Sequence, residues 1–131
     1  MKIFVYGSLR RGMHNDIQRF FDQTGAEFEY LGTTTLKADM YSLGAYPYIT
    51  EPFPYDRTGP VVIGEVYDIK SSRSRLLKAL DRLEGYPSFY NRKEVKTIFG
   101  DVWVYFIDRI GDKMSQVENG DWVSYVNGRN K

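Results

Sequence analysis

The chain alternates between two kinds of hydrophobic pattern, and the first kind predicts strands. Short runs rich in β-branched and aromatic residues are typical of strands. Five runs have this character: residues 2–6, 27–43, 61–69, 90–99 and 102–108. The second run is long enough for one long strand or a bent pair. Gly64 indicates a bulge or the close approach of another backbone, and Gly100–Asp101 predicts a two-residue hairpin turn between the last two runs.

The second kind of pattern repeats every three to four residues and predicts two helices. The first helix has its apolar residues on one face: Ile17, Phe20 and Phe21. Asn15 is its expected N-cap and Gly25 its expected end. The second helix has a longer apolar stripe: Leu76, Leu77, Leu80 and Leu83. Ser71 or Ser72 is expected to cap its start, and Gly85 to end it.

A proline-rich segment, residues 44–60, lies between the second and third strand runs and contains four of the five prolines. Because it is also rich in aromatic residues, we expect a rigid flap, which could serve as a surface for a protein partner. Residues 116–131 end in a polar stretch and are expected to be frayed. The order of strands and helices predicts one α+β domain over residues 1–131, with a mixed or mainly antiparallel sheet.

Composition narrows the class of protein. The 131 residues include no cysteine, which excludes disulfides, thiol catalysis and cysteine-ligated metal. With 18 basic and 17 acidic residues, the chain lacks the basic excess typical of nucleic-acid binders. Its first apolar run is too short for a signal peptide, and no apolar stretch approaches the length of a membrane span. We therefore expect a cytoplasmic protein that binds neither nucleic acid nor membranes; its oligomeric state stays open.

The glycine-rich loop after the first strand is the first candidate site. It matches G-x-x-x-x-G, but Met13 and His14 stand where a phosphate-binding P-loop requires Lys and Ser or Thr. Its successive backbone N–H groups suit an anion or a carbonyl oxygen, and a plain tight turn is equally compatible. Ser8 is a poor candidate nucleophile, because the only histidine is six residues away and outside any nucleophile elbow. His14 lacks a second histidine or a cysteine with which to bind metal.

Glu84, at the end of the second predicted helix, is the second candidate. It lies four residues after Leu80 and seven after Leu77, so it continues the apolar stripe. Burial and the negative end of the helix dipole both disfavour a carboxylate and predict a raised pKa. Such an acid suits proton transfer near neutral pH. An ordinary helix-end glutamate is the alternative, and Asp81 and Glu65 are rival carboxyl groups.

Taken in order, short segments along almost the whole chain resemble one known family. The matching segments are "FVYGSLRRG" at 4–12, "YPYI" at 46–49, "GEVYDI" at 64–69, "ALDRLEGYP" at 79–87, "YNRKEV" at 90–95, "VWVYF" at 102–106 and "GDW" at 120–122. Together they resemble the gamma-glutamylcyclotransferase-like superfamily, particularly its small bacterial members and the gamma-glutamylamine cyclotransferases. The ordered set is more specific for the fold than for the activity.

This resemblance implies a small, mixed and mainly antiparallel β-barrel with flanking helices and a pocket at the YGSL loop. It implies that Glu84 is the general acid/base, and that the loop binds the glutamyl part of a substrate through backbone N–H groups. The loop residues concerned are Tyr6, Gly7, Ser8 and Leu9. Tyr105 is a candidate pocket wall or hydrogen-bond donor, with a core-facing strand aromatic as the alternative.

In the family reaction, the substrate's α-amine attacks its own γ-carbonyl, closes 5-oxoproline and releases an amine or amino acid. The resemblance therefore implies a small γ-glutamyl amine or amide as substrate, and no cofactor or metal. Holding the nucleophile beside its own electrophile leaves mainly positioning and proton transfer to the protein. A non-catalytic protein of the same fold, which binds a small carboxylate or amine metabolite, is the alternative function.

Overall fold

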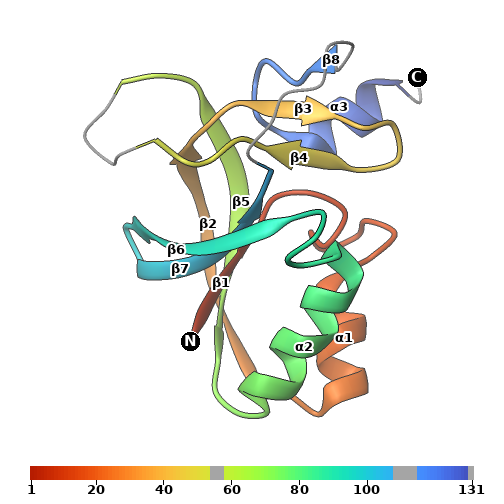
Figure 1. Ribbon diagram of the computed structural model, residues 1–131, viewed down its shortest axis with the longest axis vertical. Helices are drawn as coiled ribbons and strands as arrows, with labels where there is room; N and C mark the ends of the chain where they lie inside the picture. The colour runs from red at the N-terminus through yellow and green to blue at the C-terminus, as the bar shows by residue number, and fades with distance from the viewer. Residues whose placement is uncertain (54–57, 108–114, 130–131) are drawn as a thin grey trace.

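The computed structural model describes residues 1–53, 58–107 and 115–129, which form eight strands and three helices (Figure 1). In chain order these elements are β1 (Lys2–Val5), α1 (Ile17–Thr24), β2 (Phe28–Lys37), β3 (Met40–Ser42), β4 (Pro47–Ile49), β5 (Val61–Ile69), α2 (Arg73–Glu84), β6 (Asn91–Thr97), β7 (Gly100–Phe106), β8 (Ser115–Gln116) and α3 (Trp122–Arg129). No helix within these ranges is long and apolar enough to cross a membrane.

The strands form two sheets. The larger has the order β2-β5-β1-β7-β6, and the smaller has the order β4-β3-β8. All the pairings are antiparallel except that of β1 with β7. Helices α1 and α2 pack side by side, whereas α3 lies with the smaller sheet at the other end of the molecule (Figure 1). The predicted α+β class with a mixed, mainly antiparallel sheet is confirmed.

The larger sheet curls but does not close into the expected barrel. Among the described residues, β2 pairs only with β5 and β6 only with β7, so both are edge strands. The two edges make contact at the β6–β7 turn, where the Phe99 ring covers Gly32. A Cβ atom at Gly32 would lie 3.0 Å from Phe99 Cζ. The barrel is therefore open along a seam between β2 and β6.

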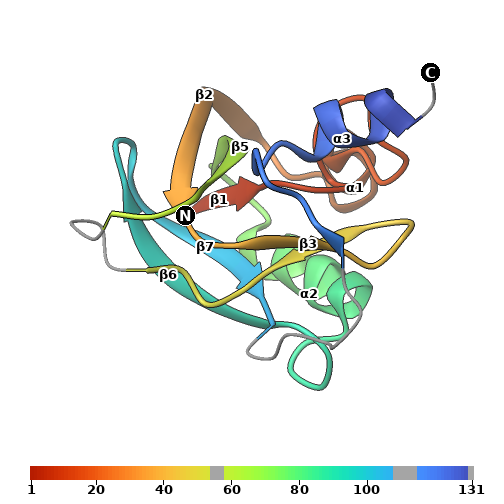
Figure 2. The same ribbon diagram turned by 90° about the horizontal axis from the view of Figure 1, so that it is seen from above.

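Strand β1 lies in the middle of the larger sheet, and its alternating side chains separate two cores. Ile3 and Val5 contribute to the core that α1 and α2 cover. Phe4 and Tyr6 contribute to the other core, which Trp122 of α3 helps to fill. Successive strand side chains point to opposite faces, so one strand reaches both cores. Viewed from above, the loop after β1 lies between α3 and the β3–β4 hairpin (Figure 2).

Several local predictions need correction. The N-cap of α1 is Asp16, whose side chain accepts a hydrogen bond from Gln18 N, and not Asn15. Ser72 precedes α2 but forms no capping hydrogen bond through its side chain. The run at 27–43 is the bent pair, β2 followed by β3, and the expected flap contains β4. Residues 54–57 of that flap lie outside the described residues.

The last hairpin and the C-terminal segment also differ from prediction. The β6–β7 turn is Ile98–Phe99, because Thr97 pairs with Gly100. The Thr97 hydroxyl donates to Gly100 O and accepts from Phe99 N. These two hydrogen bonds stabilise the turn two residues before the predicted position. The segment expected to fray forms α3, because Trp122 is buried and stacks on Tyr125. Gly64 permits a close approach: a Cβ there would lie 2.6 Å from Val5 O.

Candidate active site

A small pocket at the C-terminal end of β1 brings the predicted site residues together. Its lining includes all six of them: Tyr6, Gly7, Ser8, Leu9, Glu84 and Tyr105. Phe4, Val5, Pro47 and Tyr90 complete it, and the cavity has a volume of about 30 Å³. Four separate parts of the chain therefore meet here: the end of β1 with its loop, the start of β4, the C-terminus of α2 and the β6–β7 hairpin with the residue before it.

The loop after β1 exposes a row of backbone donors. Its carbonyl groups are occupied, since Gly7 O accepts from Arg10 N at 3.0 Å and Leu9 O accepts from Ile17 N at 2.9 Å. The described residues provide no hydrogen-bond acceptor for the N–H groups of Gly7, Ser8 and Leu9. Adjacent amides of this kind can hold a carboxylate or a carbonyl oxygen. The Ser8 hydroxyl accepts from Asn15 Nδ2 at 3.2 Å, and among the described residues no histidine or carboxylate accepts its proton.

Glu84 is the last residue of α2, immediately before Gly85 ends the helix with a φ of 66°. Burial raises the pKa of its carboxyl group to about 7, from an ordinary value of 4.5. The direction is the predicted one, and removal from water causes it. In the described part of the chain, no cation or hydrogen-bond donor contacts this carboxyl group. Near neutral pH both of its protonation states are therefore populated.

Three tyrosines surround Glu84, and each donates its phenolic proton elsewhere. Tyr6 donates to Tyr105 O at 2.8 Å, and Tyr90 donates to Pro47 O at 2.8 Å. The Tyr105 hydroxyl donates to Asp81 Oδ1 at 2.7 Å. Burial is the main cause that raises the pKa of each phenol, and the nearby Glu84 adds to it. The phenols thus remain neutral, and none of the three donates to the Glu84 carboxyl group.

The rival carboxyl groups lie in different surroundings. Asp81 accepts from Arg92 Nε at 2.8 Å and from Arg92 Nη2 at 3.2 Å, besides Tyr105. Glu65 accepts from Arg10 Nε, from Arg11 N and from the Tyr67 hydroxyl, each at 3.0 Å. The oxygens of both carboxyl groups are thus occupied by hydrogen bonds and ion pairs within the protein. Glu84 is the one of the three without such a partner among the described residues.

Some residues around the pocket escaped the sequence analysis. Pro47 and Tyr90 line it, although only their neighbourhoods in "YPYI" and "YNRKEV" gave a signal. Arg10 is almost buried and pairs with Glu65, 55 positions later, at 3.0 Å and with Asp121, 111 positions later, at 2.9 Å. No local pattern indicates such a contact. Within the described ranges, no group of three or more potential ligands could hold a metal ion.

Comparison with known proteins agrees with this geometry. Residues 3–124 match the family model of "Gamma-glutamyl cyclotransferase, AIG2-like" proteins. The Escherichia coli K12 gamma-glutamylcyclotransferase family protein YtfP is 36% identical over 124 residues, which span 94% of this chain and 96% of that protein. A Vibrio cholerae relative is 34% identical over 124 residues, covering 95% of this chain and 96% of its own length.

Solved structures show the same fold. The solution structure of E. coli YtfP superposes with a TM-score of 0.65 at 31% identity and covers both chains completely. A crystal structure of an uncharacterised Pyrococcus horikoshii protein gives a TM-score of 0.72 over 99% of this chain and 95% of its own, at 19% identity. The extent of the family match and the identity to full-length relatives establish that the chain belongs to the AIG2-like gamma-glutamyl cyclotransferase family.

Proposed function

We propose that this protein is a cyclotransferase that releases 5-oxoproline and a free amine or amino acid from a γ-glutamyl amine or amide. One observation carries the proposal: Glu84, whose carboxyl group has no partner among the described residues, lines the same pocket as the amides of Gly7, Ser8 and Leu9, which likewise have none there. Family membership supports this class of reaction. The substrate, the reaction and the residue roles belong to the proposal.

In this mechanism Glu84 handles both proton transfers. The substrate's α-ammonium group first loses one proton to solvent. The neutral amine then attacks the γ-carbonyl carbon, and the Glu84 carboxylate accepts the second proton from the attacking nitrogen as the new C–N bond forms. The C–N bond to the leaving group then breaks, as Glu84 returns the proton to the leaving amine. An acid with a pKa near 7 suits both steps, because neither protonation state is strongly favoured.

The loop amides supply binding and electrostatic stabilisation in this proposal. They hold the α-carboxylate of the glutamyl group or the oxyanion that develops on the γ-carbonyl. Because the attacking amine belongs to the same molecule as the carbonyl, correct folding of the substrate supplies much of the acceleration. No nucleophilic side chain is required in this mechanism, and the Ser8 hydroxyl instead accepts a hydrogen bond from Asn15 Nδ2.

The cavity has room for only about one or two water molecules. Binding of a whole glutamyl group therefore requires a pocket wall to move. Pro47 is the proposed wall, because it begins β4 next to the β3–β4 turn and lies against Gly7. The leaving group would extend from the pocket toward solvent.

The test is to incubate the purified protein with a panel of γ-glutamyl amines and γ-glutamyl amino acids and to assay 5-oxoproline. We expect turnover of at least one compound, and a loss of at least about 100-fold in kcat for Glu84→Gln. Glu118→Gln, at an exposed acid outside the pocket, is the matched control and should keep full activity.

Circular dichroism should show that Glu84→Gln is folded, so that lost turnover reports on chemistry. Absence of 5-oxoproline with every compound, or equal turnover by the two Gln variants, would refute the proposal. Saturable binding of a panel compound without product would support the non-catalytic alternative instead.

A further inference from the structure

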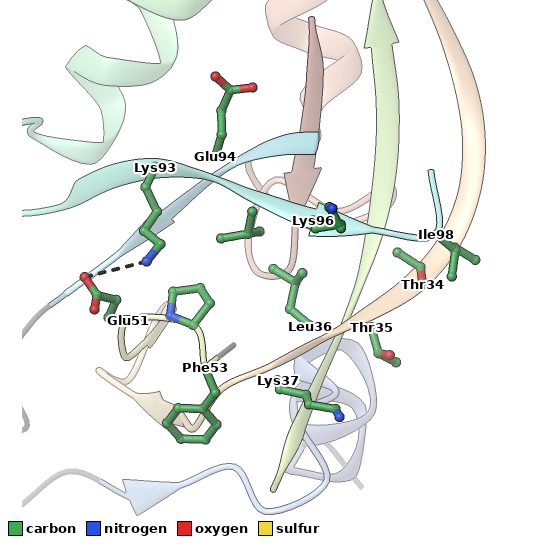
Figure 3. Close-up of a pocket in the computed structure, with 12 residues that line it drawn as sticks. Thr34, Thr35, Leu36, Lys37, Glu51, Phe53, Lys93, Glu94, Lys96 and Ile98 are labelled. Atoms are coloured by element: carbon green, nitrogen blue, oxygen red, sulfur yellow. Dashed lines mark ion pairs between the residues drawn. The ribbon is translucent and has the colours of Figure 1, made fainter. Parts of the chain in front are cut away.

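The open seam of the larger sheet forms a groove of about 550 Å³, far larger than the pocket beside Glu84 (Figure 3). Its walls are the C-terminal half of β2 and the middle of β6, and the segment Glu51–Phe53 lies across one end. At the other end Phe99 covers Gly32. None of the residues assigned to the proposed active site lines this groove.

The register of β6 shows which backbone groups face the groove. The Thr97–Gly100 pair closes the two-residue turn, so alternate residues of β6 direct their N–H and C=O groups toward β7. The residues between them, Arg92, Glu94 and Lys96, direct theirs toward the open edge. Among the described residues these outward groups have no backbone partner.

The register of β2 gives the same result on the opposite wall. Ala38 N donates to Pro60 O at 3.1 Å, so the backbone groups of Ala38 point toward β5. Every second residue before it, Leu36 and Thr34, therefore also directs its N–H and C=O groups toward β5. Thr33, Thr35 and Lys37 therefore direct their backbone groups toward the groove. Lys37 O accepts from Phe53 N at 2.7 Å, which confirms that orientation. Thr33 and Thr35 have no backbone partner on that side among the described residues.

Two free hydrogen-bonding edges thus face each other across one groove. We propose that the groove binds an extended peptide segment, which pairs with β2 on one side and β6 on the other and so completes the barrel. A single strand can pair with both edges at once. A second folded copy of this chain could present only a sheet edge, and that would pair with one wall. The stretch from Thr33 to Lys37 spans about five residues at ~3.3 Å per residue, and Phe53 N occupies only its last carbonyl group, that of Lys37.

Side-chain alternation on the walls defines the chemistry of that peptide. Leu36 of β2 and Val95 of β6 contribute to the core, so the inner face of an inserted strand meets apolar groups. The neighbouring residues Lys37 and Lys96 lie on the outer face, and neither forms an ion pair within the described ranges. A strand that alternates apolar and acidic residues matches both faces.

The acidic side chains of the groove do not cancel this preference. Glu51 forms an ion pair with Lys93, with Oε1 and Nζ 3.8 Å apart. Figure 3 shows Lys93 directed toward Glu51, and Glu94 directed to the opposite side of β6. Asp101 lies opposite Lys96 in the β6–β7 register but does not line the groove. The charged residues that do line it are Lys37, Lys93 and Lys96 against Glu51 and Glu94, and this net charge of +1 favours an acidic ligand.

The test measures fluorescence anisotropy of a labelled seven-residue peptide of alternating Val and Glu, titrated with the full chain. We expect saturable binding, and at least about tenfold weaker binding for Lys37→Glu and for Lys96→Glu. Lys78→Glu, at an exposed lysine of α2, is the matched charge control and should bind as the parent protein does. A peptide of alternating Val and Lys should bind at least about tenfold more weakly.

A second probe tests strand pairing itself. The same Val-Glu peptide with N-methyl groups on alternate amides cannot pair with both walls, and should lose binding. In amide NMR spectra, the unmethylated peptide should shift and protect Thr35 and Lys96. No saturation up to about 1 mM peptide would overturn the proposal. Equal binding of the methylated peptide, or equal affinities of Lys96→Glu and Lys78→Glu, would also overturn it. Lys37 and Lys96 would then be interpreted as charges that keep other chains from pairing with the open edges.

Discussion

The ring of Pro47 lies directly against the backbone of Gly7: a Cβ atom at Gly7 would be 2.6 Å from Pro47 Cγ and 2.8 Å from Pro47 Cδ. This contact joins the loop after β1 to the start of β4, and both residues line the pocket beside Glu84. Only a residue without a side chain can occupy position 7 while Pro47 keeps this place. The contact therefore sets the distance between two walls of the pocket.

Gly7→Ala should displace Pro47 and disturb the pocket. We expect a loss of about 1–3 kcal/mol in the free energy of unfolding, as for other insertions into tight packing. Under the proposed function, 5-oxoproline formation should also fall. Gly128→Ala is the control, since no atom lies within 4 Å of a Cβ there and the residue is in α3. Urea titration compares the two, and equal stabilities would show that Pro47 yields without cost.

The buried carboxyl group of Glu84 should make stability depend on pH. Its pKa is about 7 in the folded protein and near 4.5 when exposed, so between these values the folded state holds a proton that the unfolded state releases. The free energy of unfolding should therefore fall as pH rises from about 4.5 to 7. The fall should be at most about 3 kcal/mol, and solvent screening of the carboxyl group should make it smaller. Below and above this window, this group should contribute no slope.

Comparison with Glu84→Gln isolates that effect, because the amide does not titrate. The difference in unfolding free energy between the parent and this variant should change across the window and level off above it. Glu29→Gln, at an exposed acid of β2, is the matched control substitution. A flat difference for Glu84→Gln would mean that water reaches the carboxyl group freely. Urea titrations at a series of pH values provide the measurement.

Arg10 should be essential for stability. Its guanidinium group pairs with Glu65 and Asp121, and the Arg10 and Glu65 side chains are only 11% and 10% exposed. Arg10→Met would leave the Glu65 carboxylate with no cation in this site, and we expect a loss of about 3–5 kcal/mol. The pair Arg10→Met with Glu65→Leu should recover part of it. Lys70→Met, at a half-exposed lysine paired with Asp68, should cost far less than Arg10→Met.

Local sequence patterns predicted those helices and strands whose position depends on residues near each other in the chain. The stripe from Leu76 to Leu83 predicted α2, and Gly85 ends it as expected. The same periodicity placed Glu84 on the apolar face, and its pKa is raised in the predicted direction. The predicted dipole effect was unnecessary, since burial accounts for the shift.

Contacts between distant residues account for what the sequence did not predict. The open seam depends on how far the sheet curls, which no single strand determines. The hairpin turn differs from its predicted position because the Thr97 hydroxyl forms hydrogen bonds with two backbone groups. The dipeptide Gly100–Asp101 gave no indication of these hydrogen bonds. The interactions of Arg10 with Glu65 and of Tyr105 with Asp81 join residues 55 and 24 positions apart.

Tyr105→Phe should separate positioning from stability at the pocket. The phenol donates to Asp81 at 2.7 Å, but Asp81 keeps two hydrogen bonds from Arg92 when the phenol is removed. Loss of one hydrogen bond to a charged group should cost about 1.5–3 kcal/mol at most. Because the hydroxyl does not donate to Glu84, the pH at which Glu84 titrates should change little. Under the proposed function, kcat should then fall by less than about tenfold.

Asp81→Asn is the informative companion variant, because it removes the charge that Arg92 and Tyr105 share. Urea titration should show a larger loss of stability than Tyr105→Phe, since Arg92 loses its anionic partner in a partly buried site. If Tyr105→Phe instead abolished 5-oxoproline formation while the protein stayed folded, the phenol would contact the reacting atoms directly. The proposed division of roles, with Glu84 transferring protons and Tyr105 acting as a wall, would then be wrong.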